Sequence, residues 1–254
     1  MEEIIVIVFG LIFGSFLNVV IHRLPLEQSI VKPRSFCPKC GNTIRAIDNI
    51  PVLSYIFLRG KCRNCKTPIS IRYPLVEIFT SFTFWYSYVS AENGIVHYIF
   101  TIIFLLILIS LCLIDLEHMI LPNELTIGGS AVFLIYSFFN PEVNVVEALI
   151  SAGGITLLFI GIYIFYLKVR KIEGLGQGDI KMIFFLGIFL GARKLVITLL
   201  LASLSGLVVG IVIIIVQKKN FKYALPFGTF LSIGGFVSYF FGDEIFSFIS
   251  SLYL

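Results

Sequence analysis

The stretch EGLGQGDIKMIFFLGIFLGA, residues 173–192, places three glycines and a carboxylate, Asp179, at the start of an apolar run. An apolar run of this kind is typical of a helix that lies in lipid. A charged side chain at the centre of a membrane helix costs about 2.5–3.5 kcal/mol on insertion scales, and such residues are usually functional. Asp179 is therefore a candidate functional residue, and a partner group is expected for it.

The composition indicates a membrane protein. Hydrophobic residues make up 58% of the 254 positions, charged residues only 13%, and the mean hydropathy is +0.99. We predict an all-α polytopic membrane protein with about eight transmembrane helices, because soluble domains are about one quarter charged. Because Glu2 and Glu3 replace a basic start, the first segment is not expected to be a cleavable signal peptide. The apolar segments lie roughly at residues 4–21, 75–91, 95–114, 125–139, 145–167, 180–192, 195–216 and 225–242, with an interfacial tail possible at 244–254.

The positive charges predict the orientation of the chain. With eight spans, all of the 19 Lys and Arg residues except Arg193 and Lys194 fall on one face, most of them in residues 23–73. Lys and Arg concentrate in cytoplasmic loops. We therefore expect a multi-pass protein whose 23–73 loop is cytoplasmic and whose two termini are extracytoplasmic. The predicted division is a first transmembrane helix at 1–22, this loop, and a transmembrane core at 74–254.

The loop contains two cysteine pairs, Cys37-x2-Cys40 and Cys62-x2-Cys65, at a spacing close to that of zinc ribbons. Four thiolates complete a closed tetrahedral shell around Zn²⁺, so the predicted zinc site is structural. Two disulfides are the alternative, which a reducing compartment disfavours. Cys112 is expected to be a small core residue of an apolar helix.

A second carboxylate, Asp115, lies at the end of a long predicted apolar helix. The next helix is expected to begin after a short turn, at Pro122. Two neighbouring carboxylates permit aspartyl-protease chemistry, in which one takes a proton from water and the other, protonated, hydrogen-bonds the substrate carbonyl. The predicted helix ends favour the anion at Asp179 and the acid at Asp115. Helix capping is the alternative for Asp179. Glu77 and Glu147 are interpreted as favourable charges near helix starts.

Glycines precede Asp179. Gly176 and Gly178 lack a Cβ, so an extended substrate strand could approach the backbone there. A phosphate cradle formed by Gly174, Gly176 and Gly178 is a weak alternative, because no strand precedes it. Lys181 is expected to be a membrane-surface anchor, with tuning of the aspartates as the alternative. For Asn18 we expect a hydrogen bond between helices, and a substrate contact is the alternative.

Several motifs together resemble the bacterial type IV prepilin peptidases, over almost the whole chain. The motifs are GSFLNVVIHRLP (14–25), the paired CxxC loop, DNIPVLSYIFLRGKC (48–62), RYPLVE (72–77), DLEHMILPNELT (115–126), GLGQGDIK (174–181) and PFGTFL (226–231). The resemblance implies plasma-membrane aspartyl proteases that remove the short basic leader from prepilins and pseudopilins after a glycine, on the cytoplasmic side. It places the catalytic aspartates at Asp115 and Asp179. Leu121 and Thr229 depart from the family pattern, which often has isoleucine and proline at these positions.

The resemblance also implies a second activity. Many bacterial members methylate the new amino group with S-adenosylmethionine, and the cysteine loop and its Gly60-Lys61 pair are implicated. No Rossmann-type nucleotide site is visible in the sequence, so the position of the methyl donor is left open. The expected partners are prepilin-like substrates and membrane lipid, and no nucleic acid.

Two other functions stay open at this point. The first is a presenilin-like protease that cuts substrate helices within the bilayer, which would not require the cysteine loop. The second is a zinc-loop membrane scaffold or channel subunit without enzymatic activity, which would use the aspartates for structure or ion passage.

Overall fold

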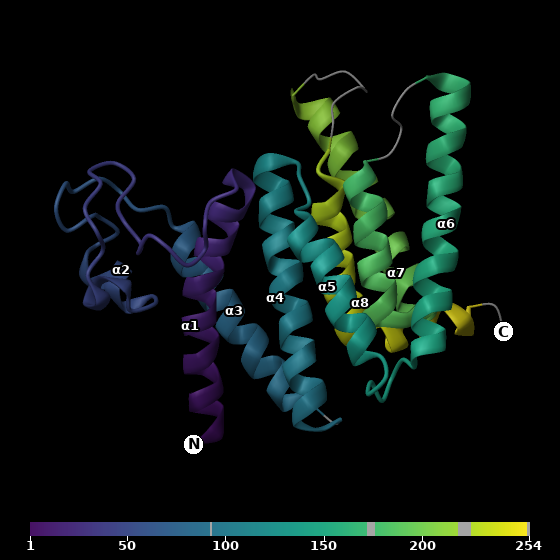
Figure 1. Ribbon diagram of the computed structural model, residues 1–254, viewed down its shortest axis with the longest axis horizontal. Helices are drawn as coiled ribbons and strands as arrows, with labels where there is room; N and C mark the ends of the chain where they lie inside the picture. The colour runs from purple at the N-terminus through teal and green to yellow at the C-terminus, as the bar shows by residue number, and fades with distance from the viewer. Residues whose placement is uncertain (92, 172–175, 218–224, 253–254) are drawn as a thin grey trace. The chain divides into compact units, whose positions relative to one another are not determined.

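The computed structural model describes residues 1–91, 93–171, 176–217 and 225–252 (Figure 1). These residues form helices without a named strand, which confirms the all-α prediction. Four helices are long and apolar enough to cross a membrane by length and composition: α1, α4, α6 and α7. The count of eight spans stays a prediction. The helices are α1 (Glu2–Arg23), η1 (Leu24–Leu26), η2 (Ala46–Asn49), α2 (Leu53–Phe57), α3 (Arg72–Val89), α4 (Gly94–His118), α5 (Asn123–Tyr136), α6 (Val145–Arg170), α7 (Gln177–Gln217) and α8 (Phe227–Ser251).

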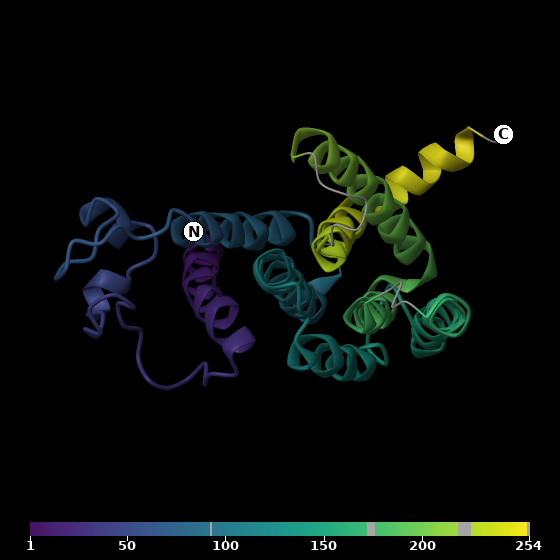
Figure 2. The same cartoon turned by 90° about the horizontal axis from the view of Figure 1, so that it is seen from above.

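Two compact units divide the chain, Met1–Leu106 and Ile107–Leu254. In the first unit, α1 packs against α3, and small residues allow the two backbones to approach closely (Figure 2). A Cβ on Gly10 would lie 2.5 Å from Ser81 Cα, and one on Gly14 would lie 2.7 Å from Glu77 Cα. The Gly10-xxx-Gly14 spacing therefore marks a helix–helix contact.

The second unit contains the rest of α4 and helices α5 to α8. Helix α7 changes direction at Gly191, whose φ of 71° and ψ of 177° are accessible to glycine and strained for other residues. Its two arms run in opposite directions (Figure 1). They correspond to the apolar segments 180–192 and 195–216. The start of the first arm and the end of the second therefore lie at the same end of this unit.

Ionic contacts stabilise the turn at Gly191. Lys194 Nζ lies 3.4 Å from Glu142 Oε2 and 3.3 Å from Asp243 Oδ2, and Arg193 Nη1 lies 3.6 Å from Asp243 Oδ1. Arg193 and Lys194 are the two exceptions to the charge asymmetry of the sequence. Nearby carboxylates offset their charge at this end of the unit.

Candidate active site and metal centre

Asp115 lies in the last turn of α4, and its side chain meets the N-terminus of α8. It is only 5% exposed. Its Oδ2 accepts a hydrogen bond from the backbone N–H of Thr229 at 2.7 Å and lies 3.1 Å from the Thr229 hydroxyl. That hydroxyl is also 3.2 Å from the carbonyl oxygen of Cys112. The first turn of α8 therefore presents donors, and the positive end of its dipole, to Asp115.

Asp179 lies in the first turn of α7 and is half-buried. Its carboxylate accepts a hydrogen bond from the backbone N–H of Gly176. This reach back from the third helical residue to the residue before the helix satisfies a donor that the helix itself leaves free. Capping is thus part of what Asp179 does.

Contacts through Leu121 place the two aspartates at one end of the second unit. A Cβ on Gly178 would lie 3.2 Å from Leu121 Cβ, and one on Gly228 would lie 2.8 Å from Leu121 Cδ2 and 3.0 Å from Asp115 Oδ2. Residues far apart in sequence are thus brought together where α4 ends and α7 begins.

The glycines before Asp179 have close neighbours. The space for a Cβ on Gly176 is occupied by Asp179 Oδ2 at 2.8 Å, and the space on Gly178 by Leu121. These contacts explain why glycine is required at both positions for packing. A role of the two glycines in substrate approach stays a prediction. Gly174, the third glycine of the motif, lies outside the described residues. Lys181 Nζ lies 2.8 Å from Asn123 Oδ1, its hydrogen-bond partner.

The hydrogen-bond donors of α8 bear on which of the two carboxyl groups, Asp115 or Asp179, is ionised. From the sequence alone, the anion is expected at Asp179, because this residue lies at a predicted helix N-terminus and Asp115 lies near a predicted C-terminus. Asp115 also accepts a hydrogen bond from the first turn of a helix, through Thr229. Helix ends therefore no longer distinguish which carboxyl group is ionised.

The four cysteines of the loop cluster as the spacing predicts. The Sγ atoms of Cys37, Cys40, Cys62 and Cys65 lie within 4.8 Å of one another, and all four are free thiols. Cys37 Sγ and Cys65 Sγ are 3.8 Å apart. Zn–S bonds of about 2.3 Å in a tetrahedron place sulfurs about 3.8 Å apart, so the donor set fits Zn²⁺.

Each cysteine pair sits on a tight turn of the same design. Cys37 N–H donates to Asn42 O at 2.9 Å, and Cys62 N–H donates to Thr67 O at 2.9 Å. Hydrogen bonding with Thr67 lowers the pKa of the Cys65 thiol to about 6. The thiolate is the form that binds metal, so the hydrogen bonds with Thr67 favour Cys65 as a ligand at neutral pH.

An ion pair joins η2 to the second cysteine turn. Arg63 Nε and Nη2 lie 2.8 and 2.6 Å from the two oxygens of Asp48. These hydrogen bonds hold the pKa of Asp48 below its usual range. Bidentate pairing of this kind fixes geometry as well as charge, so the segment around Asp48 is held to the cysteine turns.

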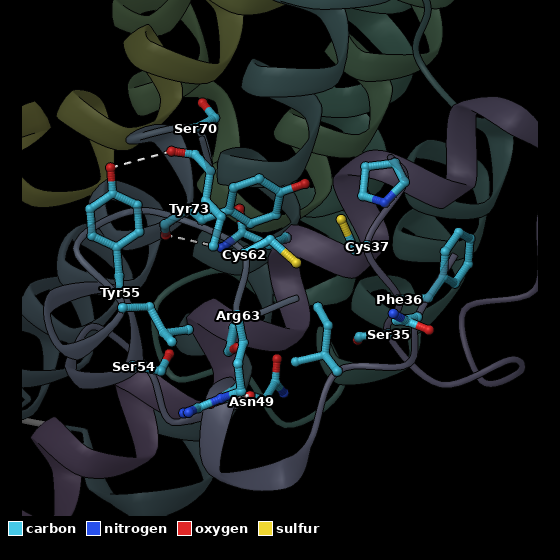
Figure 3. A pocket seen from close by; sticks show the side chains of 18 of the residues that line it. Ser35, Phe36, Cys37, Asn49, Ser54, Tyr55, Cys62, Arg63, Ser70 and Tyr73 are labelled. Carbon is cyan, nitrogen blue, oxygen red and sulfur yellow. Dashed lines mark hydrogen bonds and ion pairs between the residues drawn. The ribbon is translucent and has the colours of Figure 1, made fainter. Parts of the chain in front are cut away.

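A cavity of about 440 Å³ lies within the first unit, between the cysteine turns and the helices α1 and α3 (Figure 3). Cys37, Cys62, Tyr55 and Tyr73 line it, together with Glu77. The sequence interpretation of Glu77 as a helix-start charge is not supported, because α3 begins at Arg72 and has no acidic residue in its first turn. Its carboxylate instead accepts the Val52 N–H at 2.7 Å.

The Gly60–Lys61 pair does not line this cavity, but Gly60 supports its wall. Gly60 has a φ of +66°, and a Cβ there would lie 3.0 Å from the hydroxyl oxygen of Tyr55. Tyr55 lines the cavity and donates from that hydroxyl to Ile69 O at 3.3 Å. A larger residue at position 60 would therefore displace a wall residue. The side chain of Lys61 is exposed.

Two family models match the chain. The bacterial peptidase A24 N-terminal domain matches residues 8–91, and the type IV leader peptidase family matches residues 102–211. Relatives named prepilin leader peptidase/N-methyltransferase come from Legionella pneumophila (38% identical, covering 95% of this chain and 92% of the relative), Aeromonas hydrophila (35%, 95% and 91%) and Pseudomonas putida (36%, 94% and 91%). No solved structure shows a significant match.

These findings define a class first: the chain is a multi-helix membrane protein of the peptidase class. More specifically, it belongs to the type IV leader peptidase family and carries the N-terminal domain of its bacterial members. The resemblance stated from the motifs is thereby confirmed.

Proposed function

We propose that this chain is a membrane aspartyl endopeptidase that removes the short basic leader from type IV prepilins and pseudopilins and then methylates the new N-terminus. The observation that carries the proposal is that Leu121 packs beside Gly178 and Gly228, which brings Asp115 and Asp179 to one end of a helical unit, in a chain of this family. Cleavage follows a glycine at the cytoplasmic membrane face, and the apolar helix of the substrate stays in the bilayer.

The two carboxyl groups divide the work of peptide hydrolysis. One, ionised, takes a proton from the attacking water, and the other, protonated, donates a hydrogen bond to the scissile carbonyl oxygen. Like charges at close range make double ionisation costly, so the pair of Asp115 and Asp179 titrates as a unit. Thr229 holds the Asp115 carboxylate in place for this chemistry.

The contribution of the Thr229 hydroxyl can be measured by substitution. Because a hydrogen bond to a charged group is worth about 1.5–3 kcal/mol, we expect Thr229→Val to lower the kcat of leader cleavage about tenfold or more. Thr229→Ser keeps the hydroxyl and serves as the matched control. Equal kcat for Val, Ser and wild type would show that only the backbone N–H positions Asp115.

The orientation follows from the distribution of positive charge. With the 23–73 loop in the cytoplasm, the active-site end of the second unit faces the cytoplasm and Arg193 and Lys194 face the opposite side. Both termini are then extracytoplasmic, in a protein that crosses the bacterial inner membrane several times. This orientation suits a substrate whose basic leader stays in the cytoplasm.

The cofactors have separate tasks in this proposal. Cys37, Cys40, Cys62 and Cys65 hold a structural Zn²⁺ that orders the loop. S-adenosylmethionine, when bound, would supply the methyl group to the new N-terminal amine and would leave as the neutral thioether, S-adenosylhomocysteine, with one amine proton released. The loop residues bind and orient the reactants for this step.

The test is co-expression with a prepilin-type substrate whose basic leader ends in glycine and precedes phenylalanine and an apolar helix. Intact-mass spectrometry should show cleavage directly after the glycine, with a further 14 mass units, one CH₂, on the new N-terminus. Cleavage inside the apolar helix would instead indicate a presenilin-like protease. An uncut substrate beside well-inserted enzyme would favour a scaffold or channel role.

A further inference from the structure

The cavity of the first unit follows one face of α1. Its volume of about 440 Å³ is in the range of small-molecule sites, about 300–1,000 Å³. The α1 residues that line it recur at helical spacing: Ser15, Asn18, Val19, His22 and Arg23. Ser15 and Arg23 are separated by about 12 Å along the helix axis. The cavity is therefore long enough to hold an extended small molecule.

A buried carboxylate lies near the Ser15 end. Glu77 is 8% exposed and receives hydrogen bonds from Val52 N–H and the Ser15 hydroxyl. Among the described residues, no Lys, Arg or His forms an ion pair with it. A buried carboxyl group without a counter-ion favours a ligand that brings a positive charge, because such a ligand stabilises the ionised form.

Asn18 adds an acceptor without a partner. It is 3% exposed, and its Nδ2 donates to the carbonyl oxygens of Gly14 and Tyr73 at 3.2 and 3.1 Å. These two bonds confirm the expected link between helices and fix the orientation of the amide. Its Oδ1 is buried and has no hydrogen-bond partner. A buried acceptor of this kind is costly unless a donor fills the position, which points to an N–H or O–H group of a ligand.

A buried guanidinium lies near the other end. Arg23 is 6% exposed, and its hydrogen bonds go to the carbonyl oxygens of Ser29 and Arg34 at 3.0 and 3.5 Å. No carboxylate of the described residues forms an ion pair with it. Because a guanidinium has five N–H donors in a fork that matches a carboxylate, Arg23 is suited to bind one from a ligand.

We propose that this cavity binds S-adenosylmethionine, with its sulfonium and ribose toward Glu77 and its carboxylate toward Arg23. The molecule carries a cation, a carboxylate and several hydrogen-bond donors, which are the groups that Glu77, Arg23 and Asn18 lack as partners. Tyr55 and Tyr73 provide aromatic surface for a base to stack on (Figure 3). The inference deepens the proposed function, because it rests on the methylation step and assigns the place of the methyl donor.

The test is isothermal titration of the purified full-length protein in detergent with S-adenosylmethionine and S-adenosylhomocysteine. The second compound is a neutral thioether, so it has no sulfonium charge. We expect Glu77→Gln to weaken binding of S-adenosylmethionine at least tenfold and of S-adenosylhomocysteine much less. Glu27→Gln, which changes an exposed carboxylate outside the cavity, is the matched control and should leave both affinities unchanged.

A second variant tests the other end of the cavity. Arg23→Gln should weaken both compounds at least tenfold, because both carry the carboxylate, and should leave binding of 5′-methylthioadenosine, which lacks it, unchanged. Zinc content and leader cleavage report whether each variant is folded. If Glu77→Gln does not fold, Arg23→Gln tests the proposal by itself. The quantity to compare is its loss of affinity for S-adenosylmethionine against its loss of affinity for 5′-methylthioadenosine.

The outcomes separate this inference from the proposed function. If wild type adds 14 mass units to its product but neither variant changes the affinity, the methyl donor binds elsewhere and only the inference is overturned. The inference is also overturned if Glu77→Gln slows leader cleavage while the affinity for S-adenosylmethionine is unchanged. The cavity would then bind part of the prepilin substrate. If wild type cleaves but neither methylates nor binds S-adenosylmethionine, the methylation part of the proposed function fails as well.

Discussion

Asp115→Asn and Asp179→Asn should each abolish removal of the prepilin leader, with a fall in rate of about a thousandfold or more. Asparagine is nearly the same size as aspartate but can neither take up nor release the proton on which the reaction depends. General acid–base groups contribute about 10²- to 10⁴-fold, and loss of one member of a coupled pair also disables the other. The measurement is a time course of leader removal from a co-purified prepilin, followed by mass spectrometry.

The matched control is Asp243→Asn. It makes the same chemical change at an exposed carboxylate at the other end of the second unit, next to Arg193 and Lys194. Exposed ion pairs contribute about 0–1 kcal/mol, so this variant should cleave at nearly the wild-type rate. Cleavage by either active-site variant at the rate of the control would mean that Asp115 and Asp179 serve capping or ion passage, and the proposed mechanism would be wrong.

Local sequence was sufficient to predict several features. The helical class followed from composition, and the cysteine cluster followed from spacing, because each pair forms its own turn. In each case the responsible residues are neighbours in the chain, so the pattern is visible in a single segment.

Contacts between distant segments were not predictable in this way. Thr229 donates to Asp115 across 114 positions, and nothing near Asp115 indicates which helix N-terminus will face it. Leu121 was noted only as a departure from the family pattern, yet it packs beside both Gly178 and Gly228. These roles depend on how α4, α7 and α8 assemble, which is tertiary information.

Glu77 shows a second reason why the role of a residue could not be predicted from the sequence. Its position near a predicted helix start suggested a favourable charge–dipole interaction, but the helix begins at Arg72, so the carboxylate lies beyond the first turn. Its partner is Val52, in the loop between the cysteine pairs. An error of a few residues in a helix boundary was therefore enough to change the interpretation of a buried charge.

Loss of one zinc ligand should separate the two activities. We expect Cys37→Ser to reduce bound zinc from one ion per chain to nearly none and to abolish N-terminal methylation, while leader cleavage falls less than about tenfold. Apparent zinc-binding free energies of structural sites are about 10–16 kcal/mol, so the small cysteine loop loses its main source of order without the metal. The aspartates belong to the other compact unit, Ile107–Leu254, which has its own packing.

Elemental analysis of the purified protein gives the zinc content, and mass spectrometry of the prepilin product gives cleavage and methylation in one spectrum. Cys112→Ala is the matched control, because this cysteine lies in α4 and outside the cluster, so zinc should be retained. Equal loss of cleavage and methylation in Cys37→Ser would show that the loop is needed for the whole enzyme. Retention of zinc and methylation would mean that three cysteines suffice, and the closed four-thiolate site would be ruled out.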